Sequence, residues 1–221
     1  MLNGDDHYAY VVGYSDGTVR PNANISRAEV ATIFFRLLKK EVRDGNLTTE
    51  NIFADVTNGQ WHNKAISTMA KLGIVKGRRA DRLDLMPRSL VRSLRQSARA
   101  STPNRLRTAA ASPTFPVTGR KRDRESGGVR LDFGLSGRHV PPRRRITRAE
   151  AMTMINRVLC RMPQSESDLL DSMVTWPDNK PSDWHYLAVQ EATNSHDFNR
   201  QGEVGESWTK LTSVPDWKQY Q

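Results

Sequence analysis

The sequence predicts an all-α protein built from helix-loop-helix repeats, and three observations lead to that prediction. Two pentapeptides, ISRAE at 25–29 and ITRAE at 146–150, are nearly identical. Each begins a segment whose apolar residues recur at helical spacing. A second pair of segments, each with an aromatic-x-Asp sequence before a tryptophan, also matches. Repetition of this kind indicates an array of similar units that bury their apolar faces against one another.

Each pentapeptide has the pattern of a helix start. Ser26 and Thr147 suit the N-cap position, where the hydroxyl accepts a hydrogen bond from a free backbone N–H. Glu29 and Glu150, three residues further on, can accept a hydrogen bond from the N–H of the cap residue and so complete a capping box. The pattern therefore predicts structural capping roles for these four residues, not catalytic ones.

Arg27 and Arg148 would lie in the first turn of these helices, where a positive charge opposes the helix dipole. Two interpretations stay open. Each arginine could form a salt bridge to a neighbouring unit, or it could join free backbone N–H groups in binding a carboxylate or a phosphate. The recurrence of arginine at the same position favours anion binding.

The other half of each unit contains an aromatic-x-Asp sequence. Residues 53–66 and 176–189 share this sequence, followed at the same spacing by a tryptophan-led amphipathic segment. Asp55 and Asp178 fit loop-to-helix caps or ligand contacts, and caps are favoured. Residues 13–21 (GYSDGTVRP) predict a tight turn with Asp-Gly at its tip. Helices are therefore expected at 26–40, 61–72, 147–160 and 184–193.

The order of these motifs, F-x-D-V, W-x-x-x-A-I, L-G-I-V-x-G, G-Y-x-D-G-T-x-R-P and I-[ST]-R-A-E, resembles the S-layer homology module of bacterial surface proteins. The resemblance covers roughly 8–77 and 146–198. It implies helical repeats of about sixty residues, normally three in a pseudo-threefold bundle. It also implies that the parent protein lies at the cell surface, in the cell wall, held there because such modules bind pyruvylated wall polysaccharide.

The resemblance implies the residues that would bind the polysaccharide. Two arginines would contact the acidic ketal group, two tryptophans would line the groove between units, and two glycines would allow close approach. These residues are Arg27, Arg148, Trp61, Trp184, Gly13 and Gly77. We expect each tryptophan ring to pack partly against the core and to line the groove with its other part. No cofactor is expected.

The middle of the chain departs from the repeat. Residues 78–145 hold 18 basic and 5 acidic residues, a net charge of +13, whereas the whole chain carries +10. Their Arg-, Ser- and Pro-rich composition favours disorder, and the capped helix expected near residue 87 is absent. Back-translation into the other reading frames can give three of the missing motifs in order. We hypothesise that 79–145 is frame-shifted repeat sequence, which would leave the bundle incomplete.

These observations divide the chain into five predicted parts. They are 1–45, the second half of repeat one; 46–78, the first half of repeat two; 79–145, the basic segment; 146–163, the capped helix of repeat three; and 164–221, a partial helix with a polar tail. Trp208, Trp217 and Tyr220 in the tail could form a sugar-contacting surface or a short docking segment, and docking is favoured.

Several classes of function are not predicted. The chain has no apolar run of about 18 residues, so no membrane insertion is expected. It has no nucleotide-binding glycine loop or nucleophile elbow, so no catalytic residue and no enzyme activity are predicted. The five histidines and the single Cys160 lack the spacing of a zinc site, so no metal ligand is predicted. No signal peptide is evident. Because the chain opens midway through a repeat, we expect a fragment of an exported protein whose other domains are missing.

Two alternatives to wall anchoring stay open. The basic segment at 79–145 could bind nucleic acid non-specifically through counterion release. It has few aromatic residues, however, and no recognisable nucleic-acid fold, so no specific nucleic-acid partner is expected. The chain could also be a damaged gene product without a function.

Overall fold

Five α-helices and a three-stranded sheet make up the part of the chain that the computed structural model describes, which is residues 1–77, 79–84 and 146–221. The helices are α1 (Arg27–Arg36), α2 (Lys40–Gly45), α3 (Asn63–Lys71), α6 (Arg148–Leu159) and α7 (Tyr186–Thr193). The strands are β1 (Met162–Pro163), β2 (His196–Gln201) and β3 (Gly205–Leu211), and short 3₁₀ helices lie at Glu166–Asp168 and Trp217–Tyr220. Predictions about 85–145, including disorder, frame-shifted origin and nucleic-acid binding, lie outside the described residues.

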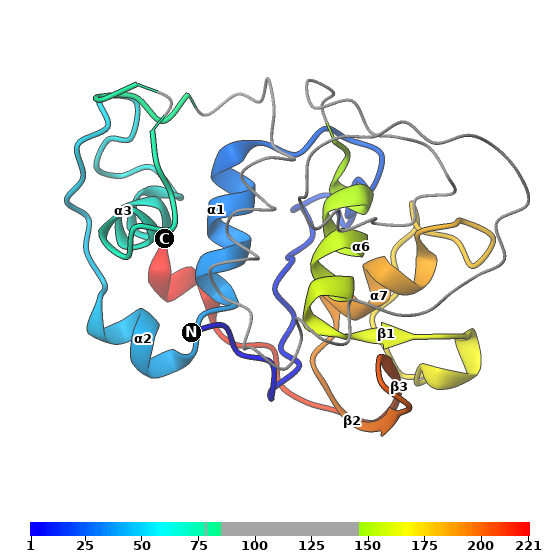
Figure 1. Cartoon of the computed structure of the whole chain (residues 1–221). Helices are drawn as coiled ribbons and strands as arrows, with labels where there is room; N and C mark the ends of the chain where they lie inside the picture. The colour runs from blue at the N-terminus through cyan, green and yellow to red at the C-terminus, as the bar shows by residue number, and fades with distance from the viewer. Residues whose placement is uncertain (78, 85–145) are drawn as a thin grey trace, which may run out of the picture.

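The four predicted helices follow one another in the order α3, α1, α6 and α7, and the N-terminal segment runs between α1 and α6 (Figure 1). Helix α3 contacts α1, and α7 contacts α6. The two central helices are joined where they begin. The backbone N–H of Ile25 donates to the carbonyl of Ile146 over 3.1 Å, and the N–H of Arg148 donates to the carbonyl of Ala23 over 2.9 Å. The two pentapeptides therefore meet in space, although they are far apart in the chain.

Both capping boxes are present. The Ser26 hydroxyl accepts from the Glu29 N–H at 3.1 Å, while the Ser26 N–H donates to the Glu29 carboxylate at 2.8 Å. Thr147 and Glu150 repeat the arrangement with distances of 3.2 and 2.8 Å. Local sequence thus fixes where α1 and α6 begin, because the caps satisfy backbone donors that a helix start leaves free.

The main hydrophobic core lies between these helices and the N-terminal segment. Its buried members come from every unit of the described chain and include Tyr10, Val19, Phe35, Met69, Met152 and Val189. A second cluster joins the outer face of α1 to α3 and its flanking turns through Ala28, Ala31, Phe53, Val56, Ile66 and Leu83. Each unit therefore buries its apolar surface against its neighbours. Among the described residues, no helix is both long and apolar enough to cross a membrane.

Asp178 connects the C-terminal unit to the turn of repeat one through hydrogen bonds. Its carboxylate accepts hydrogen bonds from the backbone N–H groups of Val19 at 3.1 Å and Arg20 at 2.7 Å. Arg20 has a φ of 51°, a left-handed conformation that is unusual for a side chain other than glycine. The aspartate therefore holds a strained turn of another unit instead of capping the helix that follows it.

Asp55 makes the same contacts in the second repeat. Its carboxylate accepts from the backbone N–H groups of Leu83 and Asp84, both at 2.9 Å. Asp84 has a φ of 57°, as Arg20 has in the first turn, and Leu83 is fully buried, as Val19 is. The repeat geometry consequently continues as far as residue 84.

The all-α prediction is wrong, because the C-terminal part of the chain contains a mixed sheet. Strand β3 lies between the other two, antiparallel to β2 and parallel to β1. The hairpin escaped prediction because its buried positions hold polar or amphipathic side chains, namely His196, Glu206 and Trp208. A period of two in apolar residues, the usual sign of a half-buried strand, is therefore missing.

The end of the chain returns to the N-terminal side of the molecule (Figure 1). Trp217 is buried, and its indole N–H donates to the carbonyl of Ala9 over 2.8 Å. The Tyr220 hydroxyl donates to the Asp44 carboxylate at the end of α2 over 2.9 Å. Arg43 lies against both aromatic rings, with its guanidinium 5.3 Å from the Trp217 ring and 4.9 Å from the Tyr220 ring.

Candidate ligand-binding groove

A groove of about 550 Å³ lies where the turn of repeat one, helix α1, the start of α3 and the start of α6 meet. It brings together three of the six residues predicted to bind polysaccharide, namely Gly13, Trp61 and Arg148. Its other lining residues are Val11, Val12, Tyr14, Ser15, Ser26, Glu29, Thr32, Ile33, Arg36 and Gln221. Surfaces from three different units therefore contribute to one concave site.

Arg148 is held firmly at the wall of this groove. Its guanidinium pairs with the Glu29 carboxylate at 2.5 Å and donates through Nε to the carbonyl of Val19 at 3.0 Å. The same group lies 5.0 Å from the centre of the Tyr14 ring, and only 6% of the residue is exposed. Of the two interpretations left open by the sequence, the salt bridge between units is therefore present for Arg148.

Glu29 connects the parts of the groove. Besides capping α1 and pairing with Arg148, its carboxylate accepts a hydrogen bond from the Tyr14 hydroxyl at 3.1 Å. Burial is the main cause that raises the pKa of Tyr14 above its ordinary value, so the phenol stays protonated and can donate. One carboxylate thus links the turn of repeat one, its capped helix and the capped helix of repeat three.

A second cation, Arg36, also lines the groove. Its guanidinium donates to the carbonyl of Tyr10 at 3.1 Å. Burial, followed by the charge of Arg148, lowers the pKa of Arg36 to about 10, which still leaves it charged at neutral pH. The ionised side chains of the lining are therefore two arginines and one glutamate, a surplus of positive charge.

Backbone donors at the start of α6 are already used. The N–H groups of Arg148 and Ala149 donate to the carbonyls of Ala23 and Pro21, each over 2.9 Å, and the Glu150 N–H donates to the Thr147 hydroxyl. An anion at this helix start would consequently be bound by side chains and not by the helix N-terminus.

Trp61 supplies an exposed aromatic surface. It lies just before α3 with 45% of its surface exposed, and its ring meets His62 edge-on with 5.0 Å between the centroids. Trp184 occupies the equivalent position before α7 and is 62% exposed, but it does not line the groove. Both tryptophans are thus exposed side chains just before a helix, but only Trp61 lines the groove.

Gly13 and Gly77 both permit close internal packing. A Cβ atom on Gly13 would lie 2.2 Å from the ring of Trp176, and one on Gly77 would lie 2.8 Å from the ring of Phe53. Trp176 and Phe53 are the aromatic residues of the two aromatic-x-Asp sequences. Contacts within the protein therefore require glycine at both positions, independently of any contact with a ligand.

Arg27 does not line the groove. Its guanidinium donates to the carbonyl of Lys76 at 3.1 Å, beside Gly77. Arg27 and Gly77 are therefore near each other, and Trp184 is also outside the groove lining. The structure brings three predicted ligand residues together in the groove and leaves the other three outside its lining.

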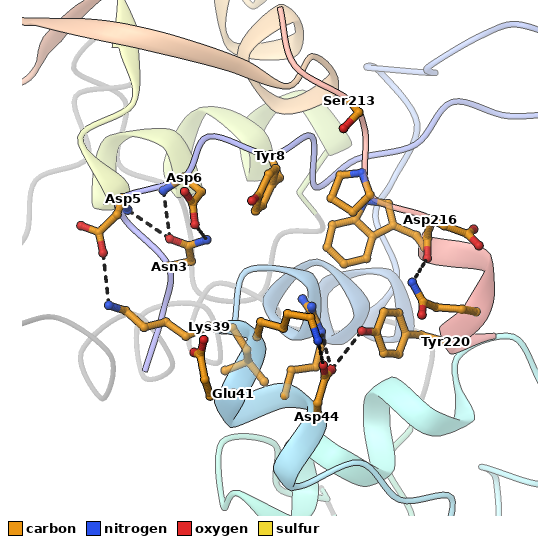
Figure 2. A pocket seen from close by; sticks show the side chains of 16 residues that line it. Asn3, Asp5, Asp6, Tyr8, Lys39, Glu41, Asp44, Ser213, Asp216 and Tyr220 are labelled. Carbon is orange, nitrogen blue, oxygen red and sulfur yellow. Dashed lines mark hydrogen bonds and ion pairs between the residues drawn. The ribbon is translucent and has the colours of Figure 1, made fainter.

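A second hollow, of about 660 Å³, lies between the N-terminal segment, α2 and the C-terminal 3₁₀ helix (Figure 2). Its charged side chains are largely paired with one another, as in Lys39 with Asp5 and Lys40 with Asp44. None of the six predicted ligand residues lines it. The groove at Arg148 is therefore the better candidate site.

Sequence reasoning did not single out Tyr14 or Arg36 as site residues. Tyr14 belongs to the GYSDGT turn, which was recognised as a turn and as part of a family motif, and Arg36 lies in the last turn of α1. Their place in the groove depends on how the units pack. A repeat pattern in one sequence does not reveal that arrangement.

Comparison with known protein families bears directly on this site. The family model of the S-layer homology domain matches residues 8–31 and 52–81. These segments contain the turn of repeat one, the start of α1 and the tryptophan-led helix α3. The match confirms the resemblance to the S-layer homology module over these two segments.

Three curated proteins show related sequence. Cell surface glycoprotein 1 of Acetivibrio thermocellus is 38% identical over 74 residues, which cover 34% of this chain and 3% of that protein. The Cellulosome-anchoring protein of the same organism is 33% identical over 92 residues, 36% of this chain and 21% of the relative. Amylopullulanase of Thermoanaerobacterium thermosulfurigenes is 36% identical over 67 residues, 30% of this chain and 3% of that enzyme. The chain thus spans a small part of each relative, and no solved structure matches it.

Proposed function

We propose that this chain is a wall-anchoring module that binds a polysaccharide of the bacterial cell wall and so holds a protein at the cell surface. The S-layer homology match and the similarity to a Cellulosome-anchoring protein support this role. The role is one of binding, and it assigns no catalytic residue to the chain.

The observation that carries the proposal is the groove where Trp61 and Arg148 meet. An exposed indole offers an apolar face on which a sugar ring can stack, and arginines beside it can bind an acidic substituent. Because these groups come from different repeats, the site requires that the units be assembled. Binding and folding of the array would then be coupled.

The ligand we infer is pyruvylated secondary cell-wall polysaccharide. A pyruvyl ketal carries a carboxylate on an otherwise neutral sugar, which matches a groove with two arginines, one glutamate and an exposed tryptophan. Arg148 and Arg36 would attract the carboxylate, and Glu29 would keep Arg148 in place. Arg27, beside Gly77, would contact a further ketal group along the polymer.

Replacing Trp61 with alanine should weaken binding to purified pyruvylated wall polymer on the order of tenfold, because stacking on an aromatic face is lost. The measurement is a co-sedimentation assay at graded protein concentrations. Trp184→Ala is the matched control, since Trp184 occupies the same repeat position outside the groove. Equal binding by the two variants would contradict the assignment of the groove.

The arginine roles are tested in the same assay with the Arg27→Ala, Arg148→Ala double variant. Circular dichroism must first show that the variant retains its helices, because Arg148 also pairs with Glu29. A folded double variant that binds the polymer as well as the unmodified chain would reject both arginines as ligand contacts.

A further inference from the structure

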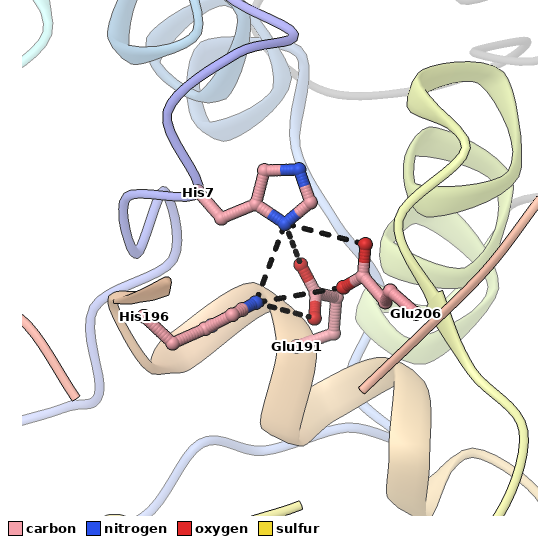
Figure 3. Close-up of side chains that lie close together, drawn as sticks. All are labelled: His7, Glu191, His196 and Glu206. Atoms are coloured by element: carbon pink, nitrogen blue, oxygen red, sulfur yellow. Dashed lines mark hydrogen bonds and ion pairs between the residues drawn. The ribbon is translucent and has the colours of Figure 1, made fainter. Parts of the chain in front are cut away.

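Four titratable side chains from separate parts of the chain converge in the interior, away from the groove (Figure 3). They are His7 of the N-terminal segment, Glu191 of α7, His196 of β2 and Glu206 of β3. Each residue is at least 98% buried. One ligand atom from each, two imidazole nitrogens and two carboxylate oxygens, lies within 4.8 Å of the others.

The spacing of these groups is close to that of the ligands around a tetrahedral metal ion, with the two histidine nitrogens facing different oxygens of each glutamate. His7 Nδ1 lies 3.3 Å from His196 Nε2 and 3.3 Å from a Glu206 oxygen, and His196 Nε2 lies 3.3 Å from a Glu191 oxygen. The remaining histidine–carboxylate distances are 3.5 and 3.6 Å. Metal–ligand bonds of about 2.0–2.2 Å, as zinc makes to imidazole and carboxylate, place tetrahedral ligands about 3.3–3.6 Å apart.

Several polar atoms of the cluster lack a hydrogen bond. Both oxygens of Glu206, one oxygen of Glu191 and Nε2 of His7 have no hydrogen-bond partner among the described residues. Burying a carboxylate oxygen without a hydrogen bond or a cation costs considerable free energy. These carboxylate oxygens lie 3.3–3.6 Å from His7, His196, Arg161 or Arg200 without forming a hydrogen bond, so their lone pairs are available to a cation bound between the two glutamates.

Two arginines face the cluster, and neither lies between the two glutamates as a bound metal ion would. Arg161, fully buried, lies 3.3 Å from Glu191 on one side, and Arg200, about one-third exposed, lies 3.6 Å from Glu206 on another. Arg161 also donates to two backbone carbonyls of the N-terminal segment, at Asp6 and Tyr8. Each arginine therefore pairs with one of the two glutamates, whereas an ion among the four ligand atoms would join both.

Outer contacts orient three of the four ligands, namely His196, Glu191 and His7. The Nδ1 atom of His196 lies 3.2 Å from the carbonyl of Asn194, so an N–H at Nδ1 leaves the Nε2 lone pair directed at the cluster. The Trp208 indole N–H donates to the Glu191 carboxylate at 3.0 Å. The His196 ring stacks on Trp208, and the His7 ring stacks on Phe198, with centroid separations of 4.0 and 3.8 Å. Partners of this kind commonly fix the ligands of a metal site.

We propose that His7, Glu191, His196 and Glu206 bind a divalent transition-metal ion, with Zn²⁺ as the ion whose preferred coordination fits best. Two neutral imidazoles and two carboxylates would neutralise the ion, and four protein ligands leave no open position for catalysis. The site is therefore structural. It ties the N-terminal segment to α7 and to both strands of the hairpin.

The test uses the full chain, stripped with EDTA and then dialysed against Zn²⁺. We expect one Zn²⁺ per chain by mass spectrometry of the metal content, and a higher melting temperature with Zn²⁺ than with EDTA. Co²⁺ in place of Zn²⁺ should give the strong visible absorption of a tetrahedral ion. This absorption reports on the site geometry without any substitution.

Two conservative variants, His7→Gln and Glu206→Gln, should each lose Zn²⁺ affinity on the order of 100-fold or more. His62→Gln is the matched control, since His62 is also buried but lies at the start of α3, outside the cluster. Unchanged Zn²⁺ affinity in the two cluster variants would overturn the proposal. So would a folded, unmodified chain that takes up neither Zn²⁺ nor Co²⁺, which would leave the cluster bridged by protons.

Discussion

Replacing Glu29 with alanine should lower the free energy of unfolding by about 3–5 kcal/mol, the range measured when one partner of a buried ion pair is removed. The carboxylate accepts from the Ser26 N–H, from the Tyr14 hydroxyl and from Arg148. Arg148 is almost fully buried and would lose its ionic partner. Urea denaturation followed by circular dichroism measures the loss.

The contribution of the capping box can be separated from that of the ion pair. Ser26→Ala removes the cap hydroxyl and should cost about 1 kcal/mol. Arg148→Met, alone and combined with Glu29→Ala, completes a double-mutant cycle that isolates the coupling between the two charges. If Glu29→Ala costs no more than Ser26→Ala, the link between the two repeats contributes nothing to stability.

Replacing Gly77 with alanine should cost about 1–3 kcal/mol, the usual penalty of forcing an extra carbon into a packed site. The new Cβ would lie 2.5 and 2.7 Å from the carbonyl oxygens of Arg79 and Arg82, which are backbone atoms that cannot rotate away. Thermal unfolding of this variant is compared with that of Gly4→Ala, where nothing lies within 4 Å of the added carbon. Equal melting temperatures would show that the turn after α3 is not packed as described.

Local signals predicted the helices well. The starts of α1 and α6 follow from capping boxes that involve only residues three apart, and α3 and α7 follow from tryptophan-led amphipathic segments. Such patterns depend on a short stretch of chain, so one sequence is enough to find them. The structure has a helix at each of the four expected places, but α1 ends at Arg36 instead of reaching residue 40, and the short helix α2 was not predicted.

Features that depend on packing between distant segments were not predictable. The β2–β3 hairpin buries His196, Glu206 and Trp208, so its sequence has the composition of a polar tail. The four residues of the proposed metal site come from four segments and form no spacing motif. Likewise, Trp61 and Arg148 share a groove only because α1 and α6 begin side by side.

The central claim is that the groove at Trp61 and Arg148 recognises an acidic wall polymer. Its most direct test is a calorimetric titration of the full chain with pyruvylated wall polysaccharide and with the same polymer after mild acid has removed the ketal. We expect removal of the ketal to weaken binding by about tenfold or more, because an arginine–carboxylate contact contributes about 1.5–3 kcal/mol. Equal affinity for the two polymers would contradict the claim.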